Sequence, residues 1–133
     1  MTDADTAVRM GSGDVPVLAT PRLIAWMEAA TVRAAVPFLG AGRTTVGTAV
    51  HVEHLRATGV GGEIEVTAEP ASAPTGRRLT FAVRAVDGSG RVVARGEIER
   101  AVVDRQRFLA RRSDAGPGEG PPDEGPPSDA TTP

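Results

Sequence analysis

The chain contains no cysteine, no tyrosine and no lysine among its 133 residues. The missing cysteines exclude disulfides, thiolate-ligated metal sites and a thiolate nucleophile, and the missing lysines exclude a Schiff base and a P-loop. Aromatic residues make up only 3% of the chain, which leaves little material for stacking nucleic-acid bases. Since the formal net charge is −2 as well, we expect no nucleic-acid partner.

The sequence also argues against a metal site and against a membrane-spanning segment. The only imidazoles, His51 and His54, lie three residues apart in a segment with strand character, so they point to opposite faces. We therefore expect neither a metal site nor a cofactor. The longest apolar stretches fall short of the roughly 18 residues that a membrane-spanning helix needs. The opening residues MTDADTAVRM are unlike a secretory signal, so we expect a cytoplasmic protein without membrane contact.

Composition divides the chain into three parts. Residues 1–13 are predicted to be a flexible N-terminus, and residues 14–112 to form one folded domain. The overall apolar content of 40% is enough for a core. Residues 113–133 hold five acids and no base among prolines and glycines. Because so few apolar groups cannot offset the entropy of ordering, we predict a disordered acidic tail there.

One long helix is predicted from Thr20 onward. Thr20 followed by Pro21 is typical of a helix start, with a hydroxyl for the N-cap and a proline in the first turn. Pro37 and Gly40 end the helix. An apolar face recurs between them at helical spacing, made of Leu23, Met27, Ala30 and Ala34.

After the helix the period changes from 3.6 to 2, which indicates strands. The segments with this pattern are 44–52, 64–68, 79–86 and 92–103. The turn Asp-Gly-Ser-Gly at 87–90 is typical of a hairpin. A helix followed by an antiparallel meander is an α+β fold. Because its sheet leaves an edge open to another copy, we expect a homodimer or a higher oligomer.

Three polar residues stand in this apolar framework: Thr20, Glu28 and His54. A hydroxyl, a carboxylate and an imidazole are the groups that acyl transfer to water requires. Helical spacing puts Glu28 nearly opposite Arg22 and Arg33, where a carboxylate is costly unless it is paired or used in chemistry. Structural explanations stay open: Thr20 as an N-cap, Glu28 paired with an arginine or reaching solvent, and His54 as a polar strand end.

The surroundings of these residues resemble a known family. The segments VLATPRLIAWMEAA, VGTAVHVEHLRAT and GRRLTFAVRAVDGSGRVVARGEIERAVVD are similar to hotdog-fold thioesterases of the fluoroacetyl-CoA thioesterase type. The similarity spans Val17 to Phe108. It implies a hotdog fold, in which an antiparallel sheet wraps one long central helix, two units pair through their sheets, and active sites lie at the dimer interface.

The resemblance also implies that the protein hydrolyses an acyl-CoA or acyl-carrier thioester with Thr20, Glu28 and His54 as its catalytic group. Glu28 would act as a general base or assist Thr20, and His54 would donate to the leaving thiolate or fix the geometry. Whether Thr20 forms an acyl intermediate or orients water stays open. Gly47 would offer a backbone N–H to the developing oxyanion. The candidates for binding the CoA phosphates, which are otherwise ordinary surface arginines, are Arg77, Arg78 and Arg100.

The sequence departs from what a specialist for a tiny acyl group needs. The segment GSGDVPVLA before Thr20 has no aromatic residue to cover the carbonyl, so we expect the thioesterase reaction but not the fluoroacetyl specificity. The alternative is a non-catalytic hotdog module that binds an acyl thioester or a small hydrophobic metabolite. Such a module would not need a carboxylate on the inner helix face. A hotdog dehydratase would need an Asp/His pair in a hydratase motif, which the sequence does not show.

Overall fold

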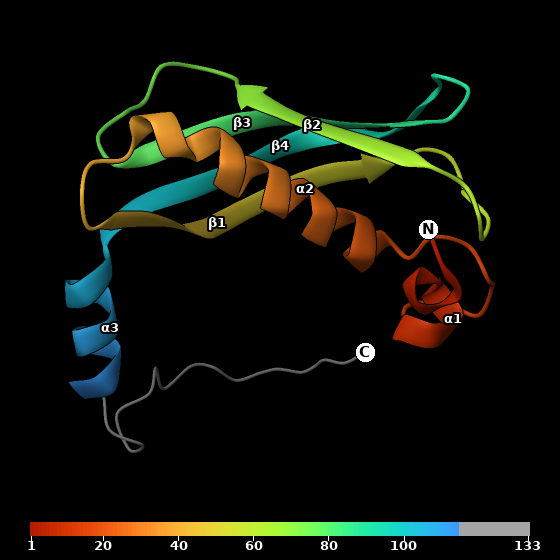
Figure 1. Cartoon of the computed structure of the whole chain (residues 1–133), viewed down its shortest axis with the longest axis horizontal. Coiled ribbons are helices and arrows are strands. Elements are labelled where there is room, and N and C mark those ends of the chain that lie inside the picture. The colour runs from red at the N-terminus through yellow and green to blue at the C-terminus, as the bar shows by residue number, and fades with distance from the viewer. Residues whose placement is uncertain (115–133) are drawn as a thin grey trace.

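The computed structural model of this chain describes residues 1–114 (Figure 1). Its main elements are one long helix and four strands: α2 (Thr20–Ala35), β1 (Arg43–His54), β2 (Ile64–Pro70), β3 (Arg78–Asp87) and β4 (Val92–Asp104). The shorter elements are the 3-10 turns η1 (Asp3–Asp5) and η2 (Val36–Phe38) and the helices α1 (Ala7–Met10) and α3 (Arg105–Asp114). The predicted helix and strands are confirmed. Most of the predicted acidic tail, residues 115–133, lies outside the described residues.

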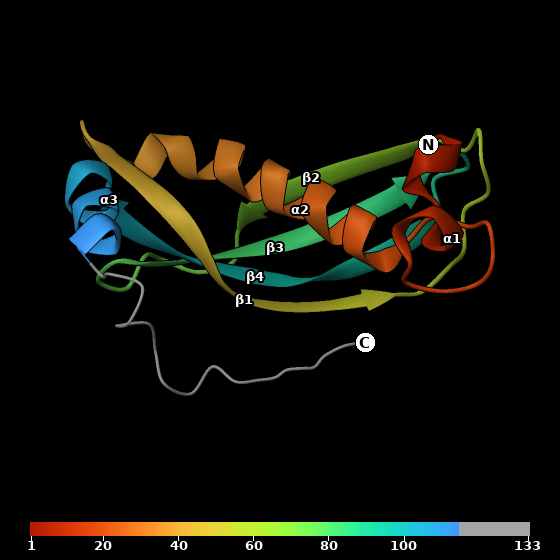
Figure 2. The same cartoon turned by 90° about the horizontal axis from the view of Figure 1, so that it is seen from below.

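The strands form one antiparallel sheet in the order β1-β4-β3-β2, and α2 lies across one face of it (Figures 1 and 2). β4 pairs with β1 so that Gly47 is opposite Arg100 and His54 is opposite Ala94. β1 and β2 are the two edges, because neither pairs with a second strand within residues 1–114. The architecture is the α+β arrangement that the sequence predicted.

The core lies between α2 and the sheet. The helix face predicted from the spacing is confirmed, because Leu23, Met27 and Ala30 are buried and Ala34 is half-buried. Burying each leucine-sized side chain contributes about 1.5–3 kcal/mol relative to leaving it in water. The largest fully buried apolar side chains are Phe81, Leu18, Leu23, Met27, Ile98 and Val93.

The N-terminal segment packs against this domain. The Met1 amino group donates to the Gly62 carbonyl at 2.9 Å, Thr6 and Ala7 are buried, and Thr6 forms a β-bridge with Leu18. Composition, which favoured flexibility for residues 1–13, did not show these contacts. In the part of the chain that the structure describes, no helix is long and apolar enough to cross a membrane.

Candidate active site

Thr20 and His54 meet at the start of α2. The Thr20 Oγ1 atom lies 2.8 Å from His54 Nδ1, which is a strong hydrogen-bond distance. α2 supplies Thr20 from its first turn, and β1 supplies His54 as its last residue. The expectation that Thr20 caps the helix is wrong. Ala19 is the N-cap and no side chain makes a capping bond, because the Thr20 hydroxyl bonds to the imidazole instead.

The protonation state of His54 suits a proton acceptor. Burial lowers the pKa of His54 below its usual value, and the backbone of Arg56 partly opposes this shift. The imidazole is therefore neutral near pH 7. With the hydrogen on Nε2, Nδ1 can accept the Thr20 proton. Nε2 itself is buried, and it makes no hydrogen bond of good geometry within the described residues.

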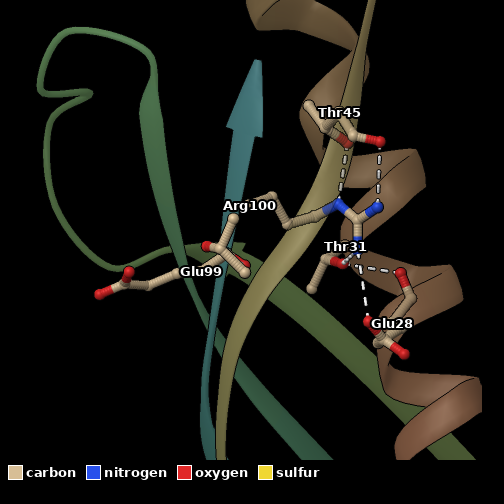
Figure 3. A network of polar contacts seen from close by, with 6 residues as sticks. Glu28, Thr31, Thr45, Glu99 and Arg100 are labelled. Atoms are coloured by element: carbon tan, nitrogen blue, oxygen red, sulfur yellow. Dashed lines mark hydrogen bonds and ion pairs between the residues drawn. The ribbon is translucent and has the colours of Figure 1, made fainter. Parts of the chain in front are cut away.

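Glu28 lies in the middle of α2 and points toward Arg100 on β4 (Figure 3). Its Oε2 atom is 3.7 Å from Arg100 Nη1. A Cβ atom added at Gly47 would lie 2.7 Å from the same Oε2, so Gly47 leaves the space that the carboxylate occupies. The Glu28 side chain is 40% exposed. The carboxylate is thus held by the protein and still within reach of water.

Arg100 is the buried centre of this second group, with 6% of its surface exposed. Its Nε donates to Thr45 Oγ1 at 2.8 Å, and its Nη2 donates to the Thr45 carbonyl at 3.2 Å (Figure 3). Nη1 lies 3.5 Å from Thr31 Oγ1. A buried cation is costly unless it is paired and hydrogen-bonded, and these oxygens meet that need. The prediction that Arg100 binds a CoA phosphate does not fit this position, where the guanidinium instead holds Glu28.

Burial lowers the pKa of Arg100, and the charge of Glu28 opposes that shift. The ordinary pKa of an arginine is so high that the guanidinium keeps its proton at neutral pH. Glu28 therefore faces a permanent positive charge, which fixes where its carboxylate lies.

Arg77 and Arg78 lie at the other end of the sheet from Thr20. Both are exposed, and Arg78 Nε is 3.9 Å from Glu99 Oε1. Arg77 lines a small hollow beside α3 together with Arg107, Phe108 and Arg111. Binding of CoA phosphates by Arg77 and Arg78 stays a prediction.

The structure divides the predicted catalytic residues into two groups. Thr20 and Glu28 are separated by about 12 Å of helix rise, at 1.5 Å for each residue. Gly47 and His54 are separated by about 23 Å of strand, at about 3.3 Å for each residue. Among the described residues, the hydrogen bond of the Thr20 hydroxyl is to His54, and the ion pair of Glu28 is to Arg100. Within one protomer the carboxylate does not reach the hydroxyl and the imidazole.

A pocket of about 310 Å³ opens beside Thr20 and His54. Apart from Arg56, its other walls are small or aliphatic and come mainly from the N-terminal segment: Ala7, Ser12, Gly13, Val15, Val17, Leu18, Leu55 and Ala57. The volume and the apolar lining suit a short acyl chain next to the Thr20 hydroxyl. Within the described protomer, no aromatic side chain lines this pocket.

A larger hollow, of about 790 Å³, lies elsewhere on the molecule. Its lining includes Glu53, Arg84, Arg95 and Glu97, which alternate along their strands with the residues that face α2. The hollow therefore lies on the opposite face of the sheet. None of the predicted catalytic residues lines this hollow. Choosing the candidate active site by pocket volume alone would therefore select the wrong face of the sheet.

An antiparallel sheet with one long helix laid across it is the hotdog fold, and the threonine and histidine pair at the helix start is compatible with acyl-transfer chemistry. The model of the fluoroacetyl-CoA-specific thioesterase (FlK) family matches residues 1–106. This chain belongs to that family.

Individual relatives agree with this assignment. The fluoroacetyl-CoA thioesterase of Streptantibioticus cattleyicolor is 42% identical over 95 residues, which are 71% of this chain and 67% of that protein. A variant of the fluoroacetyl-CoA-specific thioesterase FlK in complex with fluoroacetate and CoA is 35% identical with a TM-score of 0.73, covering 81% of this chain and 90% of that one. A hot-dog-like protein from Thermanaerovibrio acidaminovorans, 23% identical with a TM-score of 0.71, covers 86% of this chain and 83% of its own and supports the fold alone.

Proposed function

We propose that this protein hydrolyses an acyl-CoA thioester to the free acid and CoA, using Thr20, Glu28 and His54. The observation that carries the proposal is the 2.8 Å contact between a hydroxyl and a neutral imidazole, beside a pocket of acyl size. Membership of the thioesterase family supports a thioester as the substrate. The complex of the relative FlK with CoA supports CoA as the thiol.

Thr20 and His54 act as nucleophile and base. As Thr20 Oγ1 forms a bond to the thioester carbonyl carbon, His54 takes the hydroxyl proton. The C–S bond then breaks, and the proton passes from His54 to the CoA thiolate. The positive end of the α2 dipole lies at Thr20 and stabilises the negative charge that gathers on the carbonyl oxygen.

Glu28 serves the second half of the reaction, in which water attacks acyl-Thr20. The carboxylate takes the proton of the attacking water and then returns a proton to Thr20 Oγ1 as the ester bond breaks. Its orientation comes from the charge of Arg100 and from the space left at Gly47. Because one protomer separates Glu28 from Thr20, this step needs a second copy of the chain.

The β1 edge is the surface on which two copies pair. β1 is 12 residues long, and its middle is made of the small residues Gly47, Thr48 and Ala49. β2, the other edge, is 7 residues long and ends in Pro70, which has no N–H to donate to a neighbouring strand. A long edge without proline is the better template for strand pairing, so the homodimer forms through β1.

Antiparallel pairing of two β1 strands completes the site. The two-fold axis of such a pair runs perpendicular to the sheet, so both α2 helices lie on the same face. The His54 end of one strand then runs beside the Gly47 segment of the other. Glu28 and Gly47 of one protomer meet Thr20 and His54 of the partner subunit, and the Gly47 N–H joins the donors around the oxyanion.

The test is release of free CoA thiol from a panel of acyl-CoA thioesters that begins with acetyl-CoA and lengthens the chain. We expect turnover of at least one thioester and its loss in Glu28→Gln. The matched control is Glu53→Gln, because Glu53 is a strand carboxylate with a 70% exposed side chain beside Arg95. A binding module would retain the acyl-CoA without releasing thiol, and that result would refute the proposal.

A further inference from the structure

The proposed hydrolase leaves α3 without a role. α3 begins where β4 ends and projects past the β1 edge of the sheet (Figure 1). Its two large apolar side chains, Phe108 and Leu109, are 39% and 49% exposed. Arg105, Arg107 and Arg111 lie on the same helix. A helix that presents an aromatic and an aliphatic side chain beside a free sheet edge has an unfilled contact surface.

The symmetry of the proposed dimer determines what the exposed surface of α3 contacts. Arg43, the first residue of β1, is paired with Asp104, the last residue of β4, so α3 lies at the Arg43 end of the sheet. Antiparallel pairing of two β1 strands places the Arg43 end of one strand at the His54 end of the other. α3 of each protomer therefore reaches the Thr20 and His54 end of the partner subunit. This step rests on the dimer proposed above.

The surface at that end matches α3 in polarity. It exposes four large aliphatic or thioether side chains, Val8, Met10, Val15 and Leu55. The pocket beside Thr20 opens among them, since Val15 and Leu55 also line it. Its walls within one protomer contain no aromatic group. Phe108 is the aromatic side chain that this rim lacks, and Leu109 would add to its aliphatic surface.

The charges match as well. The N-terminal residues 1–19 carry three aspartates and one arginine. Asp3 and Asp5 are paired with Arg9 and Arg22, whereas Asp14 makes no ion pair among the described residues and is exposed at the rim. Residues 105–111 of α3 carry three arginines and no acid. Opposite charges favour docking of α3 in this orientation.

We propose that α3 of the partner subunit closes the acyl pocket, with Phe108 and Leu109 forming the wall that the N-terminal segment does not provide. Each active site then takes its cover from the neighbouring chain. The aromatic residue that is missing before Thr20 is supplied from the end of β4, and the size of the acyl group is selected across the dimer interface.

Crosslinking tests the placement without using activity. The chain has no cysteine, so Val15→Cys and Leu109→Cys each carry a single thiol. The two variants, with different tags, are mixed to exchange subunits and treated with a short bis-maleimide. We expect a covalent heterodimer, and little Leu109 to Leu109 product because the two α3 helices lie at opposite ends. Val36→Cys replaces Val15→Cys in the control, since Val36 is 61% exposed but lies at the far end of α2. A monomeric protein, or equal crosslinking with Val36→Cys, overturns the proposal.

Kinetics tests the wall itself. We expect the double variant Phe108→Ala/Leu109→Ala to raise KM for the shortest accepted acyl-CoA by about tenfold. The change in KM should be smaller for longer acyl chains, because the lost wall supplies a larger share of the contacts of a short acyl group. Val36→Ala is the matched control and should leave KM unchanged. Unchanged selectivity in the double variant contradicts the proposal. An active enzyme without the crosslink refutes only the role of α3, and a crosslinked dimer that releases no thiol refutes only the hydrolase.

Discussion

The two polar groups of the site are held in different ways. Thr20 and His54 are joined by one hydrogen bond at the rim of an open pocket. Glu28 and Gly47 surround a buried arginine whose guanidinium contacts Thr31 and Thr45 as well. The first group is free to exchange its bond for one to a substrate. The second group is fixed before any substrate arrives, which suits a base that must hold water in place.

Replacing Glu28 should have the largest effect on rate. Glu28→Gln keeps the shape and a polar contact with Arg100 but removes the base, so we expect kcat to fall by roughly 10²- to 10⁴-fold. The melting temperature should fall modestly, because buried Arg100 loses its charged partner but keeps its hydrogen bonds to Thr45. Thiol release and a thermal melt of the same sample measure both. Turnover at the wild-type rate would remove Glu28 from the mechanism.

Thr20→Ala should separate rate from stability in the other group. Because Thr20 makes no capping bond, its loss should leave the melting temperature nearly unchanged while kcat falls by about 10²-fold or more. Thr20→Ser keeps the hydroxyl and should retain much of the activity. A variant that melts lower but turns over at the wild-type rate would give Thr20 a structural role only and leave catalysis to the other two residues.

Gly47→Ala tests how tightly Glu28 must be placed. The new Cβ would lie 2.7 Å from Glu28 Oε2, and the flexible carboxylate should shift rather than the strand. We expect kcat to fall by roughly tenfold, since small displacements of a reacting group are costly. Gly40→Ala is the control, because a Cβ there meets nothing within 4 Å. Equal rates for the two variants would show that the carboxylate position does not matter.

The smallest effect concerns pH. The pKa of His54 is lowered by burial, so its neutral form, which accepts the Thr20 proton, persists below the usual histidine pKa of about 6.5. We expect kcat/KM to stay level from pH 8 down to that value and to fall only at lower pH, as the imidazole gains a proton. A decline that begins above the usual histidine range would contradict a neutral, buried His54.

The sequence predicted the helix and the strands better than it predicted the contacts between them. Helical and strand periods predicted α2 and the four strands, because each depends on residues close together in the chain. Residue type singled out Thr20, Glu28 and His54 in an apolar framework, and the resemblance to the thioesterase family proposed them as the catalytic group. The contact between Glu28 and Arg100 could not be predicted, since it depends on how α2 packs across β4.

Part of that contact was nevertheless visible in the strand pattern. Ile98, Arg100 and Val102 are every second residue of β4 and therefore lie on the same face of the sheet. Because Ile98 is buried, that face is the one that packs against the core. An arginine in this series is a signal for an internal ion pair rather than for a phosphate ligand. α3 was missed because its arginine-rich sequence has only a narrow apolar face, and α1 because 4 residues carry too little periodic signal.

Mixed dimers test the shared site most directly. Chains carrying Thr20→Ala and chains carrying Glu28→Gln, each inactive as a homodimer, are combined and the heterodimer is isolated through two different tags. If the site joins Glu28 of one protomer to Thr20 and His54 of the other, the heterodimer contains one intact site and recovers about half of the wild-type thiol release. A stable heterodimer that remains as inactive as both parents would contradict the account, because it would place the whole catalytic group within one chain.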